Sequence, residues 1–98
     1  MIKIPETFNK YGYTFKLLQR TDKVALYEQS KLVSSNLTVK QYEVHLIRLQ
    51  EECVFKDTVF EEHEKLSGKK DFGLFGWSYH EYENAIKKFK ELVEEQNV

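Results

Sequence analysis

Residues 78–96 read SYHEYENAIKKFKELVEEQ, and this stretch decides the fold. Ser78 and Glu81 have the spacing of a capping box, in which each side chain accepts a hydrogen bond from the backbone N–H of the other residue. After this start, apolar side chains recur at the spacing of one helix face, at Tyr79, Tyr82, Ala85, Ile86, Phe89, Leu92 and Val93. The pattern predicts a helix from Tyr79 to about Gln96 whose apolar stripe packs on a core.

The length and composition of the chain fit one globular domain that spans residues 1–98. Hydrophobic residues make up 41% of the sequence, which separates it from the composition of disordered chains. Cys53 is the single cysteine, so no internal disulfide forms, and this suits a reducing compartment. Residues 1–6 lack the apolar run of a signal peptide, and no stretch approaches the roughly 18 consecutive apolar residues of a membrane span. We expect a soluble cytoplasmic protein that does not associate with membranes.

Alternating apolar and polar residues predict β-strands upstream of the helix. The predicted strands are residues 13–20, 24–30 and 38–50. In the third of these, β-branched and aromatic residues favour strand over helix. Polar turns at residues 21–23 and 34–36 separate the three strands, so consecutive strands are expected to pair as antiparallel neighbours.

The segment from residue 54 to residue 60 allows two interpretations. It is either a fourth strand or two short strand pieces around a turn at Lys56-Asp57-Thr58. Residues 72–77, FGLFGW, combine aromatic side chains with glycines that let the backbone bend toward the helix. The order of elements predicts an α+β fold, in which an antiparallel meander of three to four strands packs on one C-terminal α-helix.

The residue types that carry most catalytic and metal chemistry are few and scattered. Cys53, His63 and His80 stand apart, without the Cys-x-x-Cys or His-Glu-x-x-His spacing of zinc sites. The acidic run at residues 61–64 lacks the spaced oxygen ligands and the glycine of a calcium loop. We predict no catalytic residue, no metal site and no cofactor, and therefore a non-enzymatic protein.

The net charge of −1 is distributed unevenly along the chain. Residues 1–50 carry eight Lys or Arg against four Asp or Glu, and residues 51–98 carry seven against twelve. Tyrosines accompany the basic half, a combination that suits single-stranded nucleic-acid binding on an open sheet face. The residues concerned are Tyr11, Tyr13, Tyr27 and Tyr42 among Lys10, Lys16, Lys23, Lys31, Lys40 and Arg48. The pI of about 6.3 falls short of a nucleic-acid binder's basic footprint, so this function is the alternative hypothesis.

The predicted sheet has a second face that a single helix leaves open. Depending on strand register, the residues of this face include Ala25, Tyr27, His45, Ile47 and Leu49. An exposed apolar patch of this kind marks association. The leading hypothesis is therefore a protein-interaction module that forms a homodimer, or docks a partner protein, through this face.

Two motifs and their order support a resemblance. The strand motif YEVHLIR at residues 42–48 precedes DFG…GWSY at residues 71–79 and the final helix, which contains FKEL at residues 89–92. Over roughly the C-terminal two-thirds of the chain, this order resembles small accessory proteins encoded in bacteriophage and prophage genomes. The resemblance implies no catalytic or binding residue. It implies an accessory role in the cytoplasm of a bacterial host, through binding to a host or phage protein.

Overall fold

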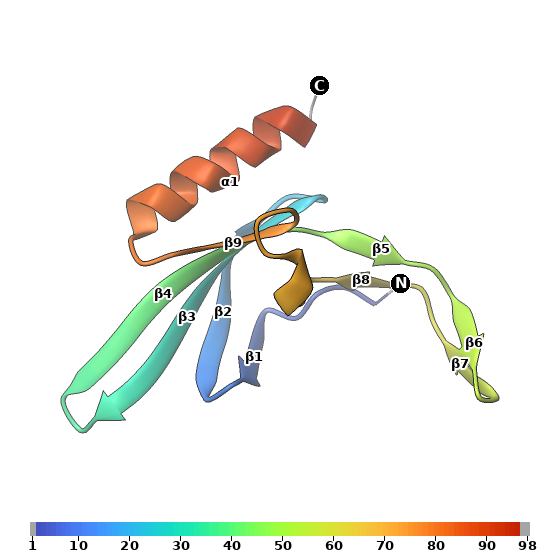
Figure 1. Ribbon diagram of the computed structural model, residues 1–98, viewed down its shortest axis with the longest axis horizontal. Helices are drawn as coiled ribbons and strands as arrows, with labels where there is room; N and C mark the ends of the chain where they lie inside the picture. The colour runs from blue at the N-terminus through green and yellow to red at the C-terminus, as the bar shows by residue number, and fades with distance from the viewer. Residues whose placement is uncertain (1, 97–98) are drawn as a thin grey trace.

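In the computed structural model, which describes residues 2–96, an antiparallel sheet carries the helix on one face (Figure 1). The strands of this sheet, hydrogen-bonded in the order given, are β1 (Thr7–Lys10), β2 (Tyr13–Arg20), β3 (Val24–Ser34), β4 (Leu37–Leu46) and β9 (Gly76–Tyr79). The helix α1 (Tyr82–Gln96) packs against β3, β4 and β9. The predicted α+β fold with one C-terminal helix is confirmed, and the sheet has five strands rather than three or four.

A narrow extension leaves the main sheet at the end of β4. Ile47 interrupts the predicted third strand, and β5 (Arg48–Gln50) pairs with β8 (His63–Lys65) in a separate sheet. Beyond it, β6 (Cys53–Phe55) and β7 (Thr58–Phe60) form a hairpin that reaches away from the body of the molecule (Figure 1). We call residues 51–62 the β6–β7 arm. The interpretation of this region as two short strands around a turn is confirmed, and the turn is Lys56-Asp57.

Alternation along the strands turns one set of apolar side chains toward α1. The buried members of this core are Val24, Leu26 and Val44 of the sheet, with Ala85, Phe89 and Leu92 of the helix. Partly buried side chains surround them: Tyr42, Leu46, Trp77, Tyr79, Ile86 and Val93. A fully buried large apolar side chain contributes about 1.5–3 kcal/mol before conformational entropy is subtracted. The stripe predicted from the sequence is therefore what fastens the helix to the sheet.

The helix begins later than the capping motif predicts. Ser78 lies in β9 and pairs with β4, and the first helical residue is Tyr82. The predicted capping box of Ser78 and Glu81 is therefore wrong. Trp77 and Tyr79 alternate with smaller residues in β9 and pack beneath the helix. Because strand pairing holds Ser78 in β9 and the helix core partly buries the rings on either side of it, tertiary packing overrides the local cap.

The sheet face opposite the helix is covered by the chain itself. Phe15, Ala25 and Tyr27 form a second buried cluster with Ile4, from the segment before β1. The Tyr27 hydroxyl donates a hydrogen bond of 2.6 Å to the carbonyl oxygen of Pro5. The expectation of an open second face is wrong, because the N-terminal segment and the residues after β8 fold over it.

The N-terminal region contains a strand that the sequence did not indicate. β1 pairs with β2 through a turn at Tyr11 and Gly12, whose φ angles are 55° and 79°. Gly12 adopts this left-handed conformation readily, which fits its place in a tight hairpin turn. A short 3-10 helix, η1 (Lys69–Asp71), follows β8. Among residues 2–96, no helix combines the length and the apolar character needed to cross a membrane.

Candidate functional site

The predicted interaction face divides into buried and accessible parts. Ala25 and Tyr27 have no exposed surface and His45 is 3% exposed, so these three side chains are interior residues. Ile47 is half-buried, and Leu49 in β5 is 54% exposed. The face predicted as an interaction surface is therefore largely a second core. Of its five residues, Leu49 is the one that a partner can reach freely.

An ion pair between β2 and β8 holds the covering segment on the sheet face opposite the helix. Arg20 of β2 donates from Nη1 and Nη2 to the two carboxylate oxygens of Glu64 of β8, at 2.7 and 2.8 Å. The backbone N–H of Ile4 donates to the same carboxylate at 3.1 Å. These hydrogen bonds, that of Arg20 above all, lower the pKa of Glu64 to about 2. Glu64 is consequently ionised at neutral pH and acts as a fixed anchor between β2, β8 and the N-terminal segment.

A pocket of about 390 Å³ opens between the covered face of the sheet and the segment around η1. Four of its fifteen lining residues are phenylalanine or tyrosine, namely Phe8, Tyr11, Phe15 and Phe72, and we call it the aromatic pocket. The rings of Phe8 and Phe15 stack in parallel with their centroids 4.6 Å apart. An apolar cavity of this size with a few polar groups has the character of a binding site.

Glu43 and His45 supply the polar side of the pocket. His45 Nε2 lies 3.0 Å from Glu43 Oε1, and His45 Nδ1 accepts a hydrogen bond of 3.3 Å from the backbone N–H of Ser67. Because Nδ1 is an acceptor, the ring proton is assigned to Nε2, which donates it to Glu43. Ser67 lines the same pocket, but both ring nitrogens of His45 are already hydrogen-bonded. His45 is therefore not placed to act as a general base for the Ser67 hydroxyl. The arrangement holds the segment after β8 on the sheet.

The mouth of the pocket carries positive charge. Tyr11 is 65% exposed there, with the Nζ atoms of Lys10 and Lys69 at 5.2 and 4.8 Å from its ring centroid. Within residues 2–96, neither ammonium group forms an ion pair. Cations over a tyrosine ring are held by the negative face of the ring. The mouth thus presents two uncompensated ammonium groups beside an aromatic side chain.

The β6–β7 arm exposes apolar side chains on both of its faces. Directly paired residues of an antiparallel hairpin share a face, and neighbours along a strand alternate. Phe55 and Phe60 therefore lie on one face, and Val54 and Val59 on the other. These four side chains are between 46% and 68% exposed. Among residues 2–96 the two strands pair only with each other, which leaves unpaired backbone groups along both outer edges.

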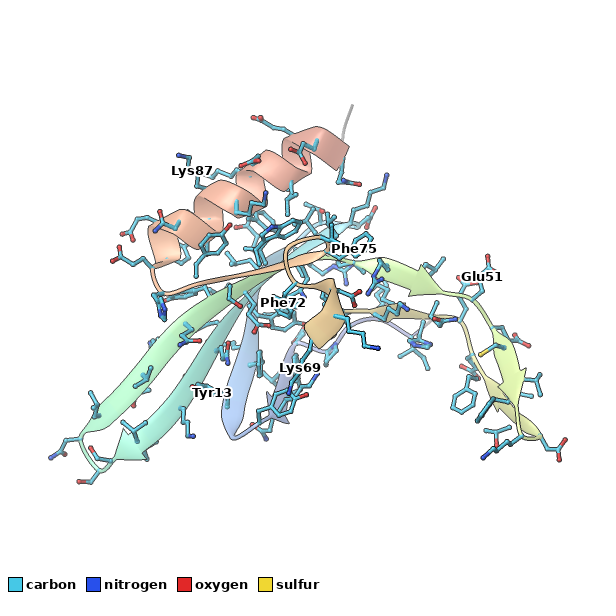
Figure 2. The ribbon with its side chains drawn as sticks, viewed as in Figure 1. Tyr13, Glu51, Lys69, Phe72, Phe75 and Lys87 are labelled. Atoms are coloured by element: carbon cyan, nitrogen blue, oxygen red, sulfur yellow. The ribbon has the colours of Figure 1, made fainter. Side chains whose placement is uncertain are left out.

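The arm is also acidic. Residues 51–62 contain five acidic residues and one lysine, a net charge of −4: Glu51, Glu52, Asp57, Glu61 and Glu62 against Lys56. Because the whole chain carries −1, the other residues together carry +3. Figure 2 shows Glu51 at the base of the arm, well separated from Lys69 and Phe72 at the pocket. Arm and body therefore differ in both position and sign of charge.

The tyrosines needed for the nucleic-acid alternative do not gather on one open face. Tyr11 is exposed and Tyr13 is half-buried, but Tyr27 is fully buried. Tyr42 lies on the helix side, where its ring contacts Tyr82 edge to face at 5.6 Å between centroids. A continuous stacking platform is therefore not formed by these four side chains.

Sequence reasoning missed both the arm and the pocket as candidate sites. The available signal for the arm was the matched triplets Cys-Val-Phe and Thr-Val-Phe on either side of Lys56-Asp57, within acidic surroundings. The turn lacks the Asn-Gly pair that usually marks a two-residue hairpin. The pocket has no local signal, since Lys10, Glu43 and Lys69 converge from distant parts of the chain.

Metal ligation and known relatives add no further assignment. Across residues 2–96, no group of three or more His, Cys, Asp or Glu side chains is placed to hold a metal ion. Cys53 is exposed and shares the arm face of Phe60, its direct partner across the hairpin.

No family model, no curated protein and no solved structure matches the chain. The candidate site therefore rests on its own geometry.

Proposed function

We propose that the protein is a non-enzymatic protein-interaction module whose β6–β7 arm binds a second copy of the chain. The observation that carries this proposal is a two-stranded hairpin, detached from the main sheet, with apolar side chains exposed on both faces. An isolated two-stranded hairpin is at best marginally stable in water, and exposed apolar surface of this kind marks association. A bound partner removes that surface from water and stabilises the arm.

Charge selects the second copy as the partner. Two arms placed side by side, each with a net charge of −4, repel each other, whereas an arm against the body of another copy meets a net charge of +3. Reciprocal contact between two copies engages both arms and gives a closed two-fold dimer. An accessory role in the bacterial cytoplasm, as the resemblance to phage proteins implies, is part of this proposal, with the dimer as the working form.

Sedimentation velocity over a range of protein concentrations tests the proposal. We expect a monomer–dimer equilibrium that added salt weakens, because the contact joins opposite charges. The double variant Phe55→Ser/Phe60→Ser should sediment as a monomer. The matched control Leu32→Ser/Leu37→Ser removes two side chains, 67% and 56% exposed, at the β3–β4 hairpin end, and should dimerise like the wild type. A monomeric wild type, or an arm variant that dimerises as well as the wild type, would overturn the proposal.

A further inference from the structure

We infer that the aromatic pocket of each copy is the receptor for the arm of the other copy, an inference that rests on the proposed function. The aromatic face of the arm carries Phe55 and Phe60, both exposed. The pocket offers walls that include Phe8, Phe15 and Phe72 in a volume of about 390 Å³. Aromatic pairs in stacked or edge-to-face contact add to the free energy gained by burying their surface. The two features therefore complement each other in their aromatic chemistry.

The charge that the pocket leaves free is positive. Of the two carboxylates that line it, Glu64 is neutralised by Arg20 at 2.7 Å. Glu43 accepts a hydrogen bond from neutral His45 at 3.0 Å and keeps its charge, so the two lining lysines outnumber the uncompensated carboxylate by one. Lys10 at the mouth, like Lys69 beside it, has no ion-pair partner within the described part of the chain. An approaching surface consequently meets uncompensated ammonium groups, which attract acidic residues.

The arm supplies acidic residues next to its aromatic face. Glu61 and Glu62 follow Phe60 directly in the chain. When Phe60 enters the pocket of another copy, these two carboxylates come to the level of its mouth, where Lys10 and Lys69 flank Tyr11. The apolar contact supplies the affinity, and the charges set the orientation of the arm.

The arm reaches the pocket of another copy rather than its own. β8 follows the arm after Glu62, and its Glu64 is fixed to Arg20 of the main sheet. This anchor sets the direction in which the arm leaves the body. Figures 1 and 2 show the arm extending outward, away from Lys69 and Phe72. Because the arm points away from the pocket of its own chain (Figure 2), contact in trans is the arrangement that we infer fills the pocket.

Charge reversal at the mouth tests the inference. In Lys10→Glu/Lys69→Glu we expect the dimer dissociation constant, measured by sedimentation velocity, to rise roughly 10-fold to 100-fold. The control Lys16→Glu/Lys87→Glu makes the same change in net charge at two exposed lysines outside the pocket lining. It should raise the dissociation constant much less than the mouth reversal, because salt screens exposed charges that lie more than about 10 Å from the contact. Circular dichroism confirms that both variants are folded.

A compensating reversal sharpens this test. Adding Glu61→Lys/Glu62→Lys to the Lys10→Glu/Lys69→Glu chain restores opposite charges at both contacts, and should restore the dimer. Suppose that Lys10→Glu/Lys69→Glu dimerises like the wild type while Phe55→Ser/Phe60→Ser is monomeric. The pocket is then not the receptor for the arm, but the proposed function still holds. If the Phe55→Ser/Phe60→Ser chain also dimerises like the wild type, the proposed function itself fails.

The single native cysteine permits a direct check of the contact. Cys53 lies on the aromatic face of the arm, so the variant Lys69→Cys places a second thiol at the proposed receptor. Under mild oxidation we expect an intermolecular disulfide between Cys53 and the introduced cysteine, identified by peptide mass spectrometry. The same variant in a Cys53→Ser background is the control. Disulfides formed between two Cys53 residues alone would place the arms side by side and contradict the inference.

Discussion

Truncation of Phe89 to alanine probes the contact that defines the fold. Phe89 is 3% exposed and lies in the buried cluster that joins α1 to β3 and β4. Removing a fully buried phenylalanine side chain leaves a cavity and costs about 3–5 kcal/mol. A domain of this size has a free energy of unfolding of about 5–15 kcal/mol, so Phe89→Ala removes a large part of it.

Thermal and urea unfolding measure this loss with a built-in reporter. Trp77 is the single tryptophan, and it packs against the same cluster with Lys88 Nζ 4.4 Å from its ring centroid. Its fluorescence therefore follows the separation of helix and sheet. We expect the melting temperature of Phe89→Ala to fall by more than about 10 °C, since each kcal/mol corresponds to about 4–8 °C in a chain of this length.

A change on the outer side of the same helix is the control. Lys87 is exposed and points away from the sheet (Figure 2), and Lys87→Ala should change the free energy of unfolding by less than about 0.5 kcal/mol. If Phe89→Ala melted within a few degrees of Lys87→Ala, the helix stripe could not be the core contact. The helix would then have to be held on the sheet by other side chains.

Three further substitutions test local features of the structure. Glu64→Gln removes a carboxylate whose pKa is lowered to about 2, so its stabilisation is complete above the ordinary pKa of 4.5 and is lost as the pH falls toward 2. The variant should be about 1.5–3 kcal/mol less stable at neutral pH, and its melting temperature should converge with that of the wild type in acid; a constant difference would contradict this. Gly76→Ala brings a Cβ within 2.9 Å of the Ser67 side chain and should cost about 1–3 kcal/mol in urea unfolding, with Ser67→Gly in the same chain relieving the loss. The turn residues Lys56 and Asp57 have φ angles of 49° and 65°, which Asn-Gly adopts more readily. Lys56→Asn/Asp57→Gly should therefore stabilise the hairpin and slow amide exchange in the arm. Faster exchange would argue against this turn.

Local patterns in the sequence were sufficient for the main layers. Period-2 alternation located β2 and much of β3 and β4, and the helical stripe identified Phe89 and Leu92 as core residues. The same local reasoning misplaced the helix start, because Ser78 and Glu81 match a capping box although Ser78 belongs to β9. A cap joins residues close together in the chain, whereas β9 pairs with the distant strand β4 and Trp77 is partly buried against the helix core. These tertiary contacts outweigh the cap and set the start of the helix, and no local pattern records them.

The second face of the sheet could not be predicted from local patterns. Ile4 and Glu64 are brought over it by a hydrogen bond between residues 60 positions apart in the chain, and Arg20 is 44 positions from Glu64. No periodicity records contacts at that separation. The alternation pattern therefore predicts Ala25 and Tyr27 on an open face, although both are buried. The candidate site lies instead at the pocket and on the arm.

Hydrogen exchange at different protein concentrations tests the central claim most directly. In the proposed dimer, the β6–β7 arm is covered by a second copy of the chain. Amides of residues 53–60 should therefore exchange more slowly as the concentration rises, and so should amides around Tyr11 and Lys69 at the pocket mouth. Amides in α1, remote from both, should be unchanged. Arm amides that exchange at the same rate at every concentration, in a sample where light scattering detects a monomer throughout, would contradict the account.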